Sequence, residues 1–137
     1  MMGVRLLTSH RQRKRLSEKK IWNYLNLFQK QHDEAHFTRI ESSTINGIPD
    51  VHCVFKGYIF WLELKANLGK NCGVSKFQIV WHLKYKRAGG NCFILNWPIL
   101  ELGPKILEIR EPGLVVPVPV LPVPVLELAL WLEDRPG

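Results

Sequence analysis

Two hydrophobic segments on either side of Lys56-Gly57 dominate the pattern of the chain. Residues 51–55 and 58–64 are rich in β-branched and aromatic side chains, and the dipeptide between them suits a turn, so the sequence predicts a tight β-hairpin. Alternate positions are apolar and should form a face packed on the core: Val51, Cys53, Phe55, Phe60, Leu62 and Leu64. The opposite face mixes polar with apolar side chains, and we expect a helix to cover its apolar part.

Apolar residues three or four positions apart predict one helix before and one helix after this hairpin. Ser17 is a suitable N-cap for a helix over residues 18–31. Ser75 is a suitable N-cap for a second helix that ends near residue 87, before a pair of glycines. Both helices are long enough to cover one face of a small sheet.

Two further strands complete the predicted core. Residues 36–43 alternate in polarity and predict a strand before the hairpin, while residues 91–96 predict a strand after the second helix. The order is therefore helix, three strands, helix and strand. A crossover after an antiparallel hairpin predicts an α/β fold with a mixed central sheet flanked by helices.

The C-terminal segment, residues 97–137, differs in character from the rest. Residues 106–110 are a possible edge strand, and residues 126–134 fit a short amphipathic helix. Between them, proline and valine alternate over residues 114–126, which excludes a central strand or a helix interior and favours an extended arm of polyproline-like or edge-strand form. Because this arm is too apolar to lie free in water, it should pack on its own domain or on a second subunit; we expect an arm that bridges two subunits.

Length and composition limit the class of protein. A chain of 137 residues is one domain in size, and it has no apolar run long enough to cross a membrane and no signal-peptide core near its start. Cys53, Cys72 and Cys92 are odd in number and widely spaced, as expected for free thiols in a reducing compartment. We therefore expect a cytoplasmic protein, in the host cell if the chain is viral.

Charge is distributed unevenly along the chain. Residues 1–90 hold 16 Lys and Arg against six Asp and Glu, a balance of +10, whereas residues 91–137 have a balance of −3. A basic field of this size attracts a polyanion and makes its binding depend on salt. A basic solubilising surface is the plainer alternative.

Two acids and a lysine are placed by the hairpin register. In a hairpin closed at Lys56-Gly57, Asp50 lies opposite Glu63, and directly opposed side chains have Cβ atoms about 4.5–5.5 Å apart. Lys65 shares the face of Glu63. Two carboxylates at that distance repel each other unless a hard cation lies between them, and Mg²⁺ is typically held by one or two carboxylates and substrate phosphate. The set therefore suits metal-assisted hydrolysis of a phosphodiester.

The same residues resemble a known family. Pro49-Asp50 followed by Glu63-Leu64-Lys65 resembles the motif of the PD-(D/E)XK nuclease superfamily, and the resemblance extends from about Ser17 to about Leu95. Downstream, Ser75-x-x-Gln78-x-x-Trp81 and the glycines after it resemble the helix that follows the motif in virus-type replication-repair nucleases. Phage and archaeal Holliday-junction resolvases share this core, so the resemblance implies a restriction-endonuclease-like fold over residues 17–96.

The resemblance also implies roles for individual residues. Asp50, Glu63 and the backbone carbonyl of Leu64 would hold Mg²⁺ or Mn²⁺. Lys65 would position or activate the attacking water, and Gln78 would orient a water or a phosphate. Glu18, on the first helix, would complete the metal site, although a carboxylate that stabilises the helix N-terminus explains it equally well.

A set of basic residues around this core would contact the DNA backbone. The set combines an N-terminal arm, residues 1–16, with lysines beside the two helices; solvated surface charges are the alternative for each member. Its members are Arg11, Arg13, Lys14, Arg15, Lys19, Lys70 and Lys76.

The sequence thus predicts a metal-dependent endodeoxyribonuclease. Small size, a basic arm and an expected homodimer favour branched DNA, such as a Holliday junction, because two subunits can cut two strands symmetrically. The alternatives are a non-specific or nicking DNA nuclease of phage replication or repair, an inactive DNA-binding protein on the same fold, an RNA-directed or defence nuclease, and an interaction protein that works through its Pro/Val-rich tail.

Overall fold

A single six-stranded mixed sheet organises the computed structural model, which describes residues 13–42 and 44–135. The strands follow one another in sequence order, and each neighbouring pair is antiparallel except β3 and β4, which are parallel. The strands are β1 (Ala35–Arg39), β2 (Val51–Phe55), β3 (Tyr58–Lys65), β4 (Cys92–Asn96), β5 (Lys105–Arg110) and β6 (Leu114–Pro117). The helices of the described residues are α2 (Glu18–Gln31), α3 (Lys76–Arg87) and α4 (Val123–Glu133), with short 3₁₀ helices η1 (Lys70–Gly73) and η2 (Leu100–Leu102).

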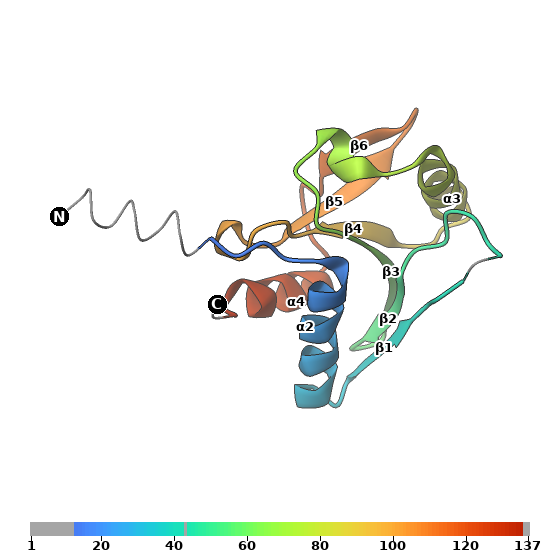
Figure 1. Cartoon of the computed structure of the whole chain (residues 1–137). Coiled ribbons are helices and arrows are strands. Elements are labelled where there is room, and N and C mark those ends of the chain that lie inside the picture. The colour runs from blue at the N-terminus through green and yellow to red at the C-terminus, as the bar shows by residue number, and fades with distance from the viewer. Residues whose placement is uncertain (1–12, 43, 136–137) are drawn as a thin grey trace.

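Helices cover both faces of this sheet. Helices α2 and α4 lie on one face, while α3, which joins β3 to β4, lies on the other (Figure 1). The larger hydrophobic core lies on the side of α2 and α4, and a smaller core lies beneath α3. Strand β4 contributes to both, with Leu95 in the larger core and Ile94 in the smaller one. The predicted α/β architecture with a mixed sheet flanked by helices is therefore found.

The central hairpin has the predicted register. Val51 pairs with Leu62 and Phe55 with Tyr58, around a turn in which both Lys56 and Gly57 have positive φ. This turn matches the right-handed twist of the flanking strands, which explains why the two residues between the hydrophobic segments fix the pairing. All six residues of the predicted apolar face are buried.

Serine caps start the two helices that the sequence predicts on either side of the hairpin. The Ser17 hydroxyl accepts a hydrogen bond from the Lys20 N–H at 3.1 Å, and α2 has the predicted bounds. In α3, the Ser75 hydroxyl accepts from the Gln78 N–H at 3.2 Å, while the Gln78 side chain accepts from the Ser75 N–H at 2.8 Å. This reciprocal capping box satisfies two N–H groups that a helix start leaves free.

Two strand predictions need correction. The first strand ends at Arg39, not at residue 43. One more hydrogen bond follows, from the Ile40 N–H to the Asp50 carbonyl at 2.7 Å, and the chain then turns toward the hairpin. The strand at residues 105–110 is not an edge strand, since β6 pairs with its far side. Pro117 is tolerated in β6 because this strand has a partner on one side only.

The predicted extended arm is also only partly correct. Residues 114–117 form the edge strand β6, as predicted, but the chain bends at residues 119–120 and α4 begins at Val123. Pro122 and Pro124 lie at the start of α4, where proline removes no helical hydrogen bond. Val125, Leu128 and Leu132 of α4 are fully buried in the larger core. The helical end of this segment therefore packs on its own domain, and the arm that bridges two subunits stays a prediction.

The residues before α2 are bound to the domain. The N–H of Lys14 donates to the Glu101 carboxylate at 2.8 Å, and the N–H of Leu16 donates to the Pro98 carbonyl at 2.9 Å. Leu16 itself is buried. The last part of the predicted basic arm thus lies against η2, and residues 1–12 lie outside the described part of the chain.

Within the described ranges, no helix has the length and apolar character needed to span a bilayer. Cys53, Cys72 and Cys92 are free and buried, as predicted. Each thiol contributes to packing, because a buried free cysteine behaves as a small apolar side chain.

Candidate active site

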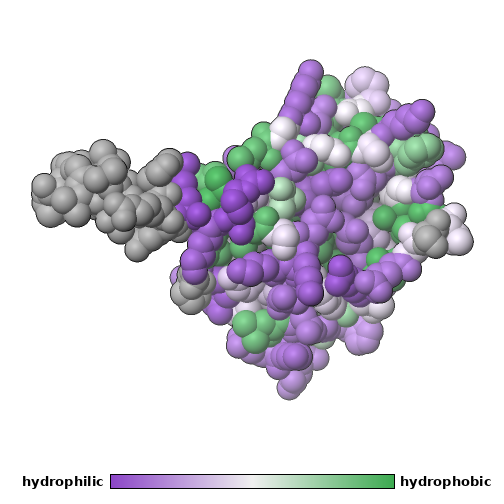
Figure 2. All heavy atoms as spheres, in the orientation of Figure 1, coloured by the Kyte–Doolittle hydropathy of each residue, from purple (hydrophilic) through white to green (hydrophobic). Residues whose placement is uncertain are grey.

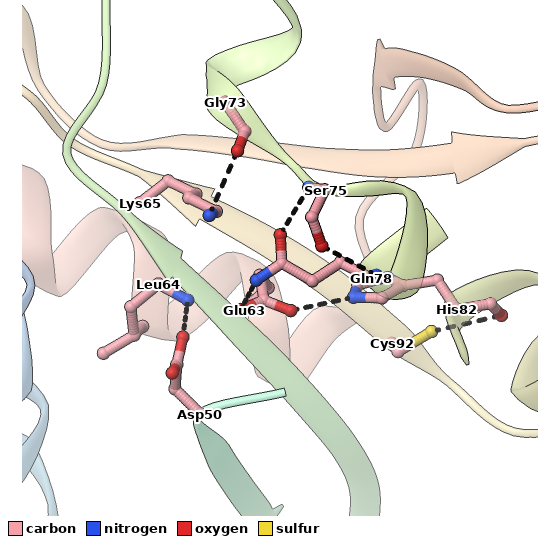
Figure 3. Close-up of polar contacts among 9 residues, drawn as sticks. All are labelled: Asp50, Glu63, Leu64, Lys65, Gly73, Ser75, Gln78, His82 and Cys92. Atoms are coloured by element: carbon pink, nitrogen blue, oxygen red, sulfur yellow. Dashed lines mark hydrogen bonds and ion pairs between the residues drawn. The ribbon is translucent and has the colours of Figure 1, made fainter. Parts of the chain in front are cut away.

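Asp50 lies at the open end of the hairpin, and its side chain points toward β3. Its N–H donates to the Leu62 carbonyl at 3.1 Å, and its carboxylate accepts from the Leu64 N–H at 2.7 Å (Figure 3). Pro49, before it, is buried and leads the chain into β2. The predicted juxtaposition of Asp50 and Glu63 at the end of the ladder is therefore present.

Glu63 lies buried between the sheet and α3. Only 1% of its surface is exposed, and both its oxygens meet side chains of α3. The Gln78 Nε2 donates to its Oε2 at 3.0 Å, and the His82 Nε2 lies 3.4 Å from its Oε1 (Figure 3). Burial and then the negative charge of Asp50 raise the pKa of Glu63 to about 9. In the metal-free protein at neutral pH this carboxyl is accordingly protonated.

Gln78 is fixed at both ends of its amide group. Its Oε1 accepts from the Ser75 N–H within the capping box, which leaves its NH₂ group to donate to Glu63 (Figure 3). The start of α3 therefore orients the amide toward the acid. The structure thus brings Gln78 into contact with Glu63. Its predicted role, to orient a water or a phosphate, stays a prediction.

His82 is a site residue that the sequence reasoning missed. It is fully buried, and its Nδ1 has no hydrogen-bond partner among the described residues. Burial and the charge of Lys86 lower the pKa of His82 to about 4, so the ring is neutral near pH 7 and its contact with protonated Glu63 is a hydrogen bond between neutral groups. Its position four residues after Gln78 on the same helix was the available signal, because such residues share a face.

Lys65 is on the face of Glu63, as predicted, and is partly buried. Its ammonium group donates to the Gly73 carbonyl at 3.4 Å, at the end of η1 (Figure 3). A second contact holds this loop in place, since the Asn67 backbone exchanges hydrogen bonds of 3.1 and 3.0 Å with the Asn96 side chain. The lysine is thus held beside the two acids by the segment that leads into α3.

Glu18 is exposed at the start of α2 and lies near the same charges. Partial burial and the charge of Asp50 raise the pKa of Glu18, whereas Lys65 and Arg39 lower it. The charge of Glu18 in turn contributes to the raised pKa of Glu63. The charge of Asp50 therefore raises the pKa of both other acids at this end of the sheet, Glu18 and Glu63.

The acids fit a hard divalent cation only in part. Within the described residues, no group of three His, Cys, Asp or Glu side chains is close enough to hold a metal ion. Asp50 and Glu63 supply carboxylate oxygens, and Mg²⁺ often binds one or two carboxylates and keeps several waters. A role for the Leu64 carbonyl stays a prediction, since the structure shows only its N–H in contact with Asp50.

The predicted DNA-contacting cations are exposed where the structure describes them. Arg11 lies outside the described residues, and Arg15 forms an isolated bridge to Ile99. The exposed members are Arg13, Lys14, Arg15, Lys19, Lys70 and Lys76. Their contacts with DNA stay predictions.

Comparisons with known proteins yield a similarity in structure. No protein-family model matches the chain, and no curated protein matches it. A solved structure described as "VRR_NUC domain" is similar with 17% sequence identity and a TM-score of 0.49, over 59% of this chain and 84% of that one.

Proposed function

We propose that this protein is a metal-dependent nuclease that hydrolyses phosphodiester bonds of DNA. The observation that carries the proposal is the convergence of Asp50, Glu63 and Lys65 at the open end of the central hairpin. Folding alone does not favour two acids in that position, because ionising both would place two negative charges side by side. The arrangement is useful where a cation and a phosphate are to be bound.

Each side chain has a distinct task in this proposal. Asp50 and Glu63 would hold Mg²⁺ or Mn²⁺, which when bound lowers the pKa of its water and stabilises negative charge on the phosphate. Lys65 would place its positive charge against a phosphate oxygen and orient the attacking water. Glu18 would add a carboxylate to the site or stabilise the start of α2, and both roles stay open.

Gln78 and His82 would orient Glu63 rather than touch the substrate. Their contacts with the two carboxyl oxygens fix its direction, in the way that hydrogen-bonded neighbours orient metal ligands in proteins. Metal binding by Glu63 requires the loss of its proton, so a high pKa makes binding favour higher pH.

The substrate we favour is branched DNA, and the state we favour is a homodimer. The strongly basic segment of residues 1–90 supports a polyanionic substrate, because its field attracts phosphates along a long surface. Two subunits would place two sites on two strands, which suits symmetrical cutting of a four-way junction. The site alone requires neither branched DNA nor a dimer.

A second candidate, a DNA-binding protein that does not cut, is favoured by one observation. Glu63 is buried, has a raised pKa and has both oxygens engaged by α3. A carboxyl held in this way resists ionisation and competes poorly for a metal. This candidate predicts DNA binding without metal-dependent cleavage.

Cleavage assays separate these candidates. A four-way junction, a matched linear duplex and a single strand would each be incubated with Mg²⁺, Mn²⁺ or EDTA. The proteins would be the wild type, Asp50→Asn, Lys65→Ala and, as a matched control, Glu41→Gln, which removes an acid that is 79% exposed and pairs with Arg39.

The outcomes differ clearly. Paired nicks on the junction that need metal, are abolished by the two site variants and persist in Glu41→Gln would support a junction-selective nuclease. Cutting of all three substrates would keep the nuclease and remove the junction selectivity. Binding of DNA without cutting in either metal would move the protein to the second candidate.

A further inference from the structure

The outer face of α3 carries an exposed hollow that the proposed catalytic residues do not use. Its volume is about 460 Å³, and its lining combines apolar and basic side chains, with no acid among them: Asn46, Lys76, Phe77, Val80, Trp81 and Lys84. Phe77 and Val80 are each 50% exposed, which is high for large apolar residues. Figure 2 shows hydrophobic atoms among hydrophilic ones on the side of the molecule where Figure 1 places α3.

The aromatic wall of this hollow is held rigidly. Trp81 stacks on Tyr85 with ring centroids 4.8 Å apart and an interplanar angle of 20°, and Trp61 of β3 meets Trp81 edge-on at 5.5 Å. His52 in turn supports Trp61 at 4.9 Å. A preorganised ring loses little conformational entropy when a ligand stacks on it.

Two lysines flank the exposed ring of Phe77. The Lys76 ammonium lies 5.4 Å from the centre of that ring, and Lys84 lies two turns further along α3. Within the described part of the chain, neither lysine forms an ion pair with a carboxylate. Their charges are therefore available to an anionic ligand.

The hollow and the acids share two structural elements. Phe77 directly precedes Gln78, whose amide contacts Glu63, so the first turn of α3 contributes to both. The loop that carries Asn46 continues to Asp50, and it packs tightly on α3, because a Cβ added to Gly47 would lie 2.2 Å from the Phe77 carbonyl oxygen. The hollow and the acids are therefore linked through the first turn of α3 and through the loop that leads to Asp50.

We propose that this hollow binds an unpaired nucleobase of the DNA strand that enters the site. The base would stack on Phe77 against the Trp81 side of the hollow, and its flanking phosphates would pair with Lys76 and Lys84. A flat ring beside unpaired lysines is the combination used to bind single strands without reading their sequence, since every base has a π-face. This inference rests on the proposed nuclease function and names its substrate class, DNA with unpaired nucleotides beside the cut.

The test measures binding of a labelled oligothymidylate and of a blunt duplex by fluorescence anisotropy in EDTA, where no cutting occurs. Phe77→Leu keeps an apolar side chain but removes the ring, and Phe77→Tyr keeps the ring. Leu130→Ala, at a residue that is 55% exposed on α4, is the matched control for loss of exposed apolar surface. Lys84→Gln tests the phosphate contact through the salt dependence of binding.

We expect Phe77→Leu to weaken oligothymidylate binding by about ten-fold and to leave duplex binding unchanged. Phe77→Tyr and Leu130→Ala should bind like the wild type, and Lys84→Gln should reduce the slope of log affinity against log salt by about one. Equal binding of the single strand by Phe77→Leu and the wild type would overturn the inference. Sedimentation that shows a wild-type dimer split by Phe77→Leu would also overturn it, because the hollow would then join two copies of the chain.

The binding experiment and the cleavage experiment test the base-binding hollow and the nuclease function separately. If Phe77→Leu loses single-strand binding but the wild type cuts no DNA in Mg²⁺ or Mn²⁺, the base site stands and the nuclease function fails. If the wild type cuts DNA while Phe77→Leu binds single strands normally, the nuclease stands and this inference fails.

Discussion

The Nε2 atom of His82 lies 3.4 Å from an Oε1 atom of Glu63, and both side chains are buried between the sheet and α3. This contact and the one from Gln78 give each oxygen of the carboxyl group a partner. The other ring nitrogen of His82 has no partner within the described residues, and leaving a buried polar atom unpaired costs free energy. We therefore expect His82 to orient Glu63 more than to stabilise the fold.

Replacement of His82 should affect metal-dependent activity more than stability. His82→Phe keeps a ring of similar size but removes its contact with Glu63, so we expect metal affinity or kcat/KM to fall by about 10–100-fold. The free energy of unfolding should change little, because the cost of leaving the buried Glu63 Oε1 without its partner is offset by removal of the unpaired Nδ1 of His82. The measurement is cleavage against metal concentration beside urea denaturation, with His36→Phe, at an exposed strand position, as the control. An unchanged metal dependence would contradict the positioning role.

The stability of the metal-free protein should depend on the protonation of Glu63. Its pKa of about 9 lies above the ordinary value of 4.5, so the folded state binds one more proton than the unfolded state between these values, and this carboxyl's contribution to stability is lost as the pH rises. The pKa of His82, lowered to about 4, adds stability as the pH rises from about 4 to 6.5.

Comparison of the wild type with Glu63→Gln separates the contribution of Glu63 to the pH dependence of stability from that of His82. Both proteins contain His82, and the variant keeps a polar amide that does not titrate. Urea denaturation in EDTA from about pH 6.5 to 9 should show the wild type losing stability relative to the variant, because only the wild type binds the extra proton. Parallel curves would show that Glu63 is already ionised in the folded protein.

Binding of a divalent cation should stabilise the protein most at high pH. Metal binding requires ionised Glu63, so the increase in Tm on adding Mg²⁺ or Mn²⁺ should grow between about pH 6 and 9. Asp50→Asn should abolish most of this increase, and Glu41→Gln should keep it. An increase in Tm of equal size in Asp50→Asn would place the metal elsewhere.

Substitutions in α4 should show that the C-terminal segment belongs to the core of the same chain. Leu128 is fully buried and Leu130 is 55% exposed, although only one residue separates them. Leu128→Ala should lower the free energy of unfolding by about 2–5 kcal/mol, and Leu130→Ala by less than about 0.5 kcal/mol.

Urea denaturation at two protein concentrations measures both substitutions and also tests the expected dimer. A midpoint that rises with concentration indicates that association contributes to stability. A monomer in analytical ultracentrifugation at micromolar concentration would exclude the subunit-bridging arm.

The three cysteines should react slowly in the folded protein. Burial raises the pKa of the Cys53 thiol well above its ordinary value and that of Cys92 to about 12, and Cys72 shifts in the same direction. Since the thiolate is the reactive form, labelling with a thiol reagent near neutral pH should be slow until denaturant is added. Rapid labelling of one thiol in the folded protein would show local opening around it.

The hairpin and its acids could be predicted because their information is local. Lys56-Gly57 fixes the turn, and the alternation of apolar residues fixes which face is buried, so the opposition of Asp50 and Glu63 follows from counting along two strands. The helix starts at Ser17 and Ser75 were predictable for the same reason, since a cap acts within three residues.

The surroundings of these acids were decided by the tertiary structure alone. That α3 lies over Glu63, with His82 against its carboxyl group, depends on how the crossover packs on the sheet. The structure of the Pro/Val-rich segment likewise depends on contacts distant in sequence. Its first residues form β6 because they pair with β5, and its last residues form α4, which packs in the larger core. Turn, cap and strand alternation are set by neighbours in sequence, whereas burial, pKa and the partners of a side chain are set by residues far away in the chain.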